Sequence, residues 1–210
     1  MKVLLVNGSP RREGNTFATL SETVKIFEAA GIETEIFWLG TKPISGCLAC
    51  LRCSGVGNCA INDVVNEFLD KAEAADGFIF GTPVHYAGAS GAMTAFMDRI
   101  AYADMGGGSG RFYLKPAAAL CTARRGGATA TWDQMNKYFG IMQMPIVTSQ
   151  YWNMVHGRVP GEAALDDEGM QTMRTLARNM VFMLRCKQIA LENGVPLPER
   201  ERGIATNFIR

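Results

Sequence analysis

Residues 2–16 read KVLLVNGSPRREGNT and set the class of fold. The first six residues of this segment are nearly all apolar and rich in Val and Leu, which is typical of a parallel strand buried on both faces. A polar loop with two glycines follows and leads directly into a helical stretch at 16–30. The segment therefore predicts the first strand, loop and helix of an α/β sheet.

The same alternation continues along the chain. Further short apolar runs predict strands at residues 33–39, 77–81, 117–122 and 145–149. Helices are predicted at residues 63–75, 91–103, 131–139 and about 167–193, with a flexible glycine-rich loop at 106–110. The last helix carries one apolar stripe: Met170, Met173, Leu176, Ala177, Met180, Val181 and Leu184. This pattern predicts a doubly wound five-stranded parallel sheet in a three-layer α/β sandwich.

Length and charge narrow the class of protein. The 210 residues are expected to form one domain at 1–193, with a cysteine-rich insert at 47–59 and a C-terminal tail at 194–210. A net charge of +1 argues against a nucleic-acid groove and an anionic membrane surface as partners. No run approaches the ~20 apolar residues of a membrane span. We therefore expect a cytoplasmic protein with no nucleic-acid or membrane partner.

Four cysteines, Cys47, Cys50, Cys53 and Cys59, follow the spacing C-x2-C-x2-C-x5-C. Two residues between thiols let consecutive sulfurs face one centre, and the longer last gap lets the chain close a fourth position. In a reducing compartment clustered thiols more often bind metal or act in catalysis than form disulfides. An iron-sulfur cluster, structural zinc, and free or redox-active thiols all remain open at this stage.

The loop after the first strand is typical of a phosphate site. Ser9 and Thr16 offer hydroxyl groups, Asn15 an amide and Arg11 a positive charge, and the helix start offers unpaired backbone N–H groups. The loop lacks the glycine patterns of a nucleotide triphosphate or dinucleotide site. The alternative is an ordinary helix start in which these side chains cap their own backbone.

Two later loops share this edge, because the carboxyl ends of parallel strands meet there. One follows the third predicted strand and offers a rigid turn with flat side chains; its candidate residues are Pro83, Val84, His85, Tyr86 and Gly88. The other follows the fourth predicted strand; its candidates are Ala123, Arg124 and Gly126. The turn could hold the planar end of the same ligand, although His85 would also suit simple packing.

In this order the motifs resemble the flavodoxin-like, NAD(P)H-dependent FMN reductase family and, within it, the iron-sulfur flavoproteins. The residues from Ser9 to Thr16 resemble the family's FMN phosphate loop. The turn at 83–86 is similar to its isoalloxazine-binding turn, and residues 123–126 to its third flavin loop. The four cysteines resemble the compact motif that ligates a [4Fe-4S] cluster in the iron-sulfur members.

The resemblance implies a flavodoxin-like fold, a non-covalent FMN and a [4Fe-4S] cluster. Chemistry would be carried by the flavin, with no catalytic side chain. It also implies a homodimer or homotetramer that passes electrons between ferredoxin or NAD(P)H and a small-molecule acceptor. A cluster-free NAD(P)H-dependent FMN, quinone or nitroaromatic reductase is the alternative enzyme. A flavodoxin-type electron carrier is the alternative of a different class, and the near-neutral charge argues against it.

Overall fold

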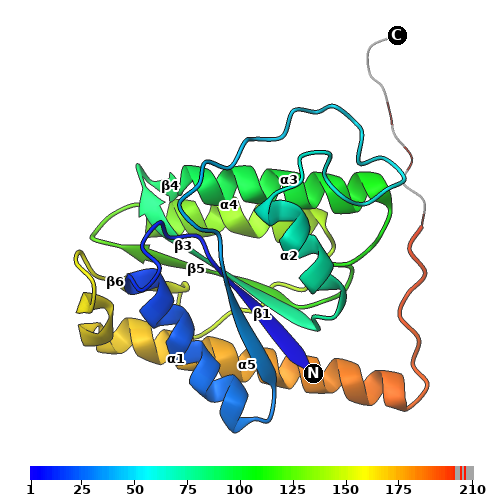
Figure 1. Ribbon diagram of the computed structural model, residues 1–210. Coiled ribbons are helices and arrows are strands. Elements are labelled where there is room, and N and C mark those ends of the chain that lie inside the picture. Colours follow the sequence, from blue (N-terminus) through cyan, green and yellow to red (C-terminus); the bar gives the residue numbers. More distant parts are fainter. Residues whose placement is uncertain (202–203, 205, 207–210) are drawn as a thin grey trace.

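The computed structural model describes residues 1–201, 204 and 206. Within these residues, five parallel strands form a sheet in the order β2-β1-β3-β5-β6 (Figure 1). The strands are β1 (Lys2–Asn7), β2 (Glu33–Trp38), β3 (Gly77–His85), β5 (Ala117–Ala123) and β6 (Met154–His156). The two-residue strand β4 (Gly88–Ala89) pairs antiparallel with the end of β3. Because the strand order reverses at β1, the sheet is doubly wound, and the predicted flavodoxin-like fold is confirmed.

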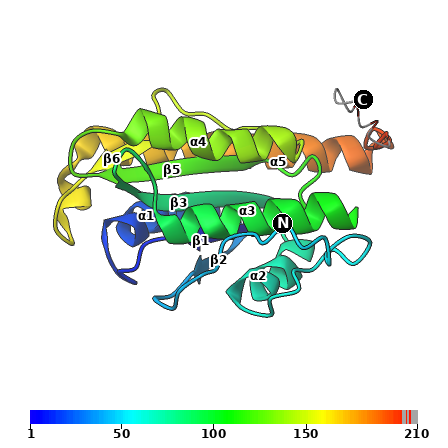
Figure 2. The same cartoon turned by 90° about the horizontal axis from the view of Figure 1, so that it is seen from above.

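Helices cover both faces of the sheet. The helices α1 (Asn15–Ala29) and α5 (Asp167–Glu192) lie on one face, with the short 3-10 helix η1 (Glu162–Leu165) against α1 (Figure 1). On the other face lie α2 (Val64–Glu73), α3 (Gly91–Gly107) and α4 (Ala128–Ile141). Figure 2 looks down on this second layer, with α2 on the β2 side and α4 over β5.

The apolar run of β1 is continuous because both of its faces are buried. Val3 and Leu5 belong to the hydrophobic core under α1 and α5, whereas Leu4 and Val6 belong to the core under α2, α3 and α4. Since successive side chains of a strand point to opposite faces, a central strand between two helical layers needs apolar residues at every position.

The predicted stripe on α5 is confirmed, since all seven of its residues are buried. The stripe packs against α1 and the sheet, and the opposite side of α5 is exposed. No helix in the described ranges combines the length and the hydropathy that a membrane crossing requires.

The fifth strand was predicted in the wrong place. The run 145–149 makes only an isolated bridge to Ala117, and the chain then leaves the sheet before returning as β6. At the return point Asn153 takes the place of a backbone partner, because its side-chain amide donates to the Ala119 carbonyl at 3.0 Å. The edge strand is therefore split by an excursion that an apolar run does not reveal.

The predicted flexible loop at 106–110 is also corrected. The helix α3 continues through Gly107 and ends at Gly108, which has a left-handed φ of 70°. A Cβ at Gly107 would lie 2.1 Å from the Gly57 Cα, so glycine here allows the cysteine-bearing loop to approach the helix. These glycines serve close packing between two segments.

Candidate functional site

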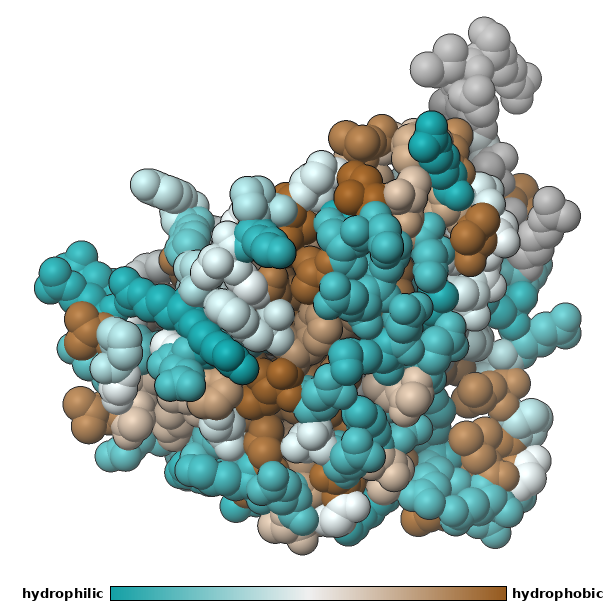
Figure 3. Space-filling view, in the orientation of Figure 1, coloured by the Kyte–Doolittle hydropathy of each residue, from teal (hydrophilic) through white to brown (hydrophobic). Residues whose placement is uncertain are grey.

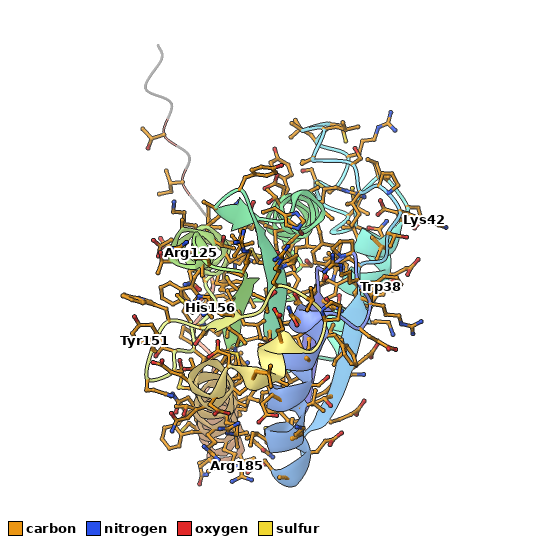
Figure 4. All side chains as sticks on the ribbon, turned by 90° about the vertical axis from the view of Figure 1, so that its left-hand side faces the viewer. Trp38, Lys42, Arg125, Tyr151, His156 and Arg185 are labelled. Atoms are coloured by element: carbon orange, nitrogen blue, oxygen red, sulfur yellow. The ribbon has the colours of Figure 1, made fainter. Side chains whose placement is uncertain are left out.

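A polar cavity of about 260 Å³ opens at the carboxyl edge of the sheet, and we call it the strand-end cavity. Its lining comes from the last residues of β3 and β5 and from the segments that follow β1, β5 and β6: Ser9, Pro10, Arg11, Asn15, Thr16, Pro83, Val84, His85, Thr122, Arg124, Gly157 and Arg158. Figure 4 faces this edge, where Trp38 marks the end of β2, Arg125 the loop after β5 and His156 the end of β6.

Eight of the predicted cofactor residues come together in this cavity: Ser9, Arg11, Asn15, Thr16, Pro83, Val84, His85 and Arg124. Four others do not line it. Tyr86 is fully exposed at the hairpin tip, and Gly88 lies in β4. Ala123 is buried at the end of β5, whereas Gly126 is exposed in the loop beyond it.

The first loop leaves the start of α1 open. Its N-cap is Gly14, and no side chain caps the helix. The Asn15 amide oxygen instead accepts a hydrogen bond from the Ala163 N–H at 3.3 Å, and the Thr16 hydroxyl is hydrogen-bonded to the Thr122 hydroxyl at 2.8 Å. The alternative of a helix start capped by its own residues is therefore wrong. Free N–H groups at a helix N-terminus, with their favourable dipole, are suited to an anion.

The loop itself is held in place by buried polar contacts. Asn7 is fully buried; its side-chain oxygen accepts from the Ser9 N–H at 3.1 Å, and its amide donates to the Arg12 carbonyl at 2.9 Å. The Ser9 hydroxyl accepts from the Arg11 N–H at 3.1 Å. The loop is thus ordered by its own residues, with the Arg11 side chain at its exposed rim.

Trp38 is a functional candidate that the sequence did not indicate. Its indole N–H donates to the Ser9 carbonyl at 2.8 Å, and the Arg12 guanidinium lies 5.6 Å from its ring centre. Trp38 ends β2, the strand next to β1, so it fixes the loop from outside. The signal that could have found it is its place near the carboxyl end of the strand predicted at 33–39, at the same edge of the sheet as the three loops.

Gly157 and Arg158 were missed because the fifth strand was misplaced. Both directly follow β6, and the Gly157 N–H donates to the Ala123 carbonyl at 2.9 Å. A Cβ at Gly157 would lie 2.7 Å from the Asn15 side-chain nitrogen, so only glycine fits here without a shift. Arg158 adds a third arginine to the cavity lining, beside Arg11 and Arg124.

The hairpin between β3 and β4 has an unusual turn beside this cavity. Tyr86 and Ala87 have positive φ angles of 50° and 60°, although neither is glycine. Gly127 backs the turn, because a Cβ there would lie 2.6 Å from the Ala87 Cα. Gln134 accepts a hydrogen bond from the Ala89 N–H at 2.9 Å. The hairpin is therefore locked against α4 and projects Tyr86 into solvent.

The four predicted metal ligands line one small cavity of about 20 Å³, the cysteine cavity. Cys53 is buried and Cys59 half-buried, whereas Cys47 and Cys50 are exposed. Two non-glycine residues between them, Ala49 and Leu51, have left-handed φ angles of 49° and 60°, a strained backbone of the kind that gathers at functional sites. No group of three or more His, Cys, Asp or Glu side chains among the described residues has the arrangement of a site for a metal ion.

Hydrogen-bond donors face two of these sulfurs. The Ala49 N–H donates to the Cys47 sulfur at 3.4 Å, and the Arg99 guanidinium donates through Nε and Nη2 to the Cys59 sulfur, at 3.3 Å each. Burial raises the pKa of the Cys53 thiol. Soft sulfur ligands around one cavity, with N–H groups aimed at them, are a donor set that fits an iron-sulfur cluster.

The sequence profile of the NADPH-dependent FMN reductases matches residues 1–158. The chain belongs to the NADPH-dependent FMN reductase family. Within this family it is 34% identical to an iron-sulfur flavoprotein of Methanocaldococcus jannaschii, over 88% of this chain and 98% of that protein, so it belongs to the iron-sulfur flavoproteins. It is an FMN-binding oxidoreductase of flavodoxin-like fold.

Solved structures share the fold of this FMN reductase family member. The flavoenzyme FerB from Paracoccus denitrificans, an NAD(P)H:(acceptor) oxidoreductase, matches with a TM-score of 0.66 at 16% identity, over 88% of this chain and 97% of that one. A flavodoxin from the domain Archaea matches with a TM-score of 0.58 at 14% identity, over 88% and 99% of the two chains. At such identities the likeness shows the fold alone.

The two cavities of this family member are separate. They share no lining residue. A second hollow of about 340 Å³ shares Pro10 and His85 with the strand-end cavity and includes residues 91 and 92 at the start of α3. The cysteine cavity contacts the same helix at Arg99, Tyr102 and Ala103. At ~1.5 Å per helical residue, the nearest of these positions, 92 and 99, are about 10 Å apart along the helix axis, and the farthest, 91 and 103, are about 18 Å apart.

Proposed function

We propose that this chain holds FMN in the strand-end cavity and a [4Fe-4S] cluster at Cys47, Cys50, Cys53 and Cys59. Electrons would pass between a donor such as ferredoxin or NAD(P)H and a small-molecule acceptor. The observation that carries the proposal is that all four thiols line one cavity in a chain with a separate anion-suited cavity at its strand ends. The name of the M. jannaschii relative gives independent support.

The residues of the strand-end cavity suit the parts of FMN. The open N-terminus of α1, with Ser9, Arg11, Asn15 and Thr16, would bind the phosphate. The turn at Pro83–His85 and the loop at Arg124 would contact the isoalloxazine ring. We assign the adjoining residues to the same two turns, next to the ring: Tyr86, Gly88, Ala123 and Gly126. Bound FMN supplies the redox chemistry, accepting a hydride or single electrons. The chain binds and orients the cofactor and provides the charges around it.

The cysteine residues would supply one thiolate to each iron of a cubane cluster. Such a group carries single electrons, which complements a flavin. Clustered thiols of this kind persist in reducing surroundings, which supports the cytoplasm as the location. The described cysteines are all free.

We also propose that the chain forms a homodimer or homotetramer, which the separate positions of the two cavities and the exposed apolar side chains near the cysteines support. Exposed apolar side chains surround the cysteines, including Leu48, Leu51, Val56 and Ile141, each more than 60% exposed. An apolar groove of about 590 Å³ runs beside them between the cysteine loop, α3 and α4. Figure 3 shows hydrophobic side chains along the upper edge, where this loop lies in Figure 1. We propose that another copy covers this surface and brings its own FMN toward the cysteines.

The decisive experiment is an anaerobic visible spectrum with iron, sulfide and flavin analysis. We expect one FMN and about four irons per chain, as a cubane requires. Cys53→Ser should lose iron and keep FMN, whereas Cys186→Ser, a change at an exposed cysteine on α5, should keep both. A wild-type chain that carries flavin and takes up no iron and sulfide would instead favour the cluster-free reductase.

A further inference from the structure

Arg99 is the most deeply buried charged side chain near the cysteines. It lies on α3, it is 1% exposed, and its guanidinium makes two contacts of 2.7 and 2.8 Å with the Asp63 carboxylate. It also donates to the carbonyls of Ile61 at 2.9 Å and Ser45 at 3.4 Å. With the two contacts to the Cys59 sulfur, six acceptor contacts serve five N–H groups, so one is shared.

Cys59 is held at its backbone as well as at its sulfur. Asn66 accepts from the Cys59 N–H and donates to the Cys59 carbonyl, both at 2.8 Å. Asn66 and Asp63 belong to the start of α2, where Asp63 is also the N-cap and accepts from the Val65 N–H. The position of this sulfur is therefore set by α2 and α3 together.

Two of the other three thiols also have hydrogen-bond partners, and these partners are neutral backbone groups. Cys47 accepts only a neutral backbone N–H, and Cys53 lies 3.8 Å from the Tyr102 carbonyl, which it faces as a donor. Within the part of the chain that the structure describes, Arg99 is the one charged side chain that donates to any of the four sulfurs. Its hydrogen bonds are charge-assisted, and burial strengthens them because water does not compete.

We propose that Arg99 is a positioning residue that raises the reduction potential of the bound cluster through its two N–H bonds to the Cys59 sulfur. This inference rests on the proposed cluster. Each electron added to a cluster and its thiolates makes that unit one charge more negative, and a fixed cation with N–H donors stabilises the more negative state. Asp63 opposes part of this effect with its own negative charge.

The chain offers a matched control in Arg111. It also anchors the cysteine-bearing loop, donating to the Gly57 carbonyl and, at 2.8 Å, to the Asn58 side chain, and it pairs with Glu73 at 2.7 Å. It donates to none of the four sulfurs. Arg111→Met therefore removes an arginine that anchors the same loop and leaves the sulfur hydrogen bonds in place.

The experiment measures the midpoint potential of the cluster in the full chain, from its EPR signal at a series of set potentials under anaerobic conditions. Arg99→Met should lower the midpoint potential. Arg99→Lys keeps the positive charge and loses the planar guanidinium, so its midpoint potential should lie between those of Arg99→Met and wild type. Asp63→Asn keeps an N-cap residue and removes the opposing charge, so it should raise the potential. Arg111→Met should match wild type.

Equal potentials in wild type and Arg99→Met would overturn the inference, as would an equal shift in Arg111→Met. Should Arg99→Met take up no iron, Arg99→Lys and Asp63→Asn carry the test, and unchanged potentials in both would overturn it. A wild-type chain that takes up no iron and sulfide would overturn the proposed cluster itself. A loaded wild type with an unchanged Arg99→Met potential would overturn only the role of Arg99.

Discussion

Single side chains tie together loops that lie far apart in the sequence. The Trp38 indole reaches the Ser9 carbonyl from the neighbouring strand, and the Thr16 and Thr122 hydroxyls join the loops after β1 and β5. The Asn15 amide reaches η1 through Ala163. A change at any of these residues should therefore disturb two segments at once.

The two arginines of the flavin loops should contribute unequally to FMN binding. Arg11 sits on the loop at the open N-terminus of α1, where the phosphate is expected, whereas Arg124 follows β5. We expect Arg11→Ala to weaken FMN binding about tenfold or more, since a hydrogen bond to a charged group is worth ~1.5–3 kcal/mol. Arg124→Ala should have a smaller effect. Flavin fluorescence on titrating the apoprotein with FMN measures both, and equal losses would refute the phosphate assignment.

Gly157 should not tolerate a side chain. Gly157→Ala would bring a Cβ to 2.7 Å from the Asn15 nitrogen and 2.8 Å from the Ala163 backbone nitrogen. We expect a loss of ~1–3 kcal/mol in the free energy of unfolding, as for other overpacked sites, together with weaker FMN binding. Chemical denaturation measures the first and flavin release the second.

Gly140→Ala is the control for this change. Gly140 lies within α4, and a Cβ there meets nothing within 4 Å. Alanine should stabilise the helix by ~0.5–1 kcal/mol and leave FMN binding unchanged. If Gly157→Ala behaved like Gly140→Ala, the close contact with Asn15 would have no energetic importance.

At the scale of elements, the helix α3 is the support on which the cysteine-bearing loop is built. The loop contacts α3 at Arg99 by hydrogen bonds and at Gly106 and Gly107 by close backbone approach, with the Gly55 N–H donating to the Gly106 carbonyl at 3.4 Å. The loop has no regular strand or helix of its own between β2 and α2. Its conformation therefore depends on this helix.

Gly107→Ala should impair the cysteine site and leave the flavin site intact. The new Cβ would lie 2.1 Å from the Gly57 Cα, and a backbone contact cannot be relieved by a change of rotamer. We expect iron uptake to fall strongly while FMN content stays at the wild-type level. Gly46→Ala is the matched control, because a Cβ at this loop position meets nothing within 4 Å. Iron and flavin analysis of both variants measures the effect, and normal iron in Gly107→Ala would contradict it.

For the whole molecule, the apolar surface around the cysteines should control assembly. Ile141→Glu places a charge at a position 61% exposed, beside the apolar groove and outside the lining of the cysteine cavity. We expect this variant to dissociate and to lose electron transfer between cluster and FMN, while both cofactors stay bound, because each cavity is built within one chain. Sedimentation velocity and anaerobic rapid-mixing spectroscopy measure the two effects.

Phe182→Glu is the control at a distance from this surface. Phe182 is 67% exposed on α5, on the opposite face of the sheet from α3 and α4. It should leave both assembly and electron transfer unchanged. A monomeric Ile141→Glu chain that still transferred electrons at the wild-type rate would show that the route lies within one subunit.

The sequence alone determined the features that depend on residues close together in the chain. Apolar runs and their helical spacing predicted four of the parallel strands, the helices and the buried stripe on α5, because burial on one or both faces imposes a period on neighbouring residues. The glycine-containing loop after β1 and the cysteine spacing also indicated their chemistry, since both depend on residues close together in the chain. Eight predicted residues consequently line the strand-end cavity.

Tertiary structure decided which distant residues complete each site. Trp38 is hydrogen-bonded to Ser9, 29 positions away, and Arg99 to Cys59, 40 positions away. Neither contact can be predicted from a pattern of neighbouring residues. The true edge strand β6 depends on Asn153 replacing a backbone partner, so Gly157 and Arg158 could be placed only once the sheet had formed. The physical reason is that hydrogen bonds and steric contacts act through space, and the order of strands and helices fixes which parts of the chain share that space.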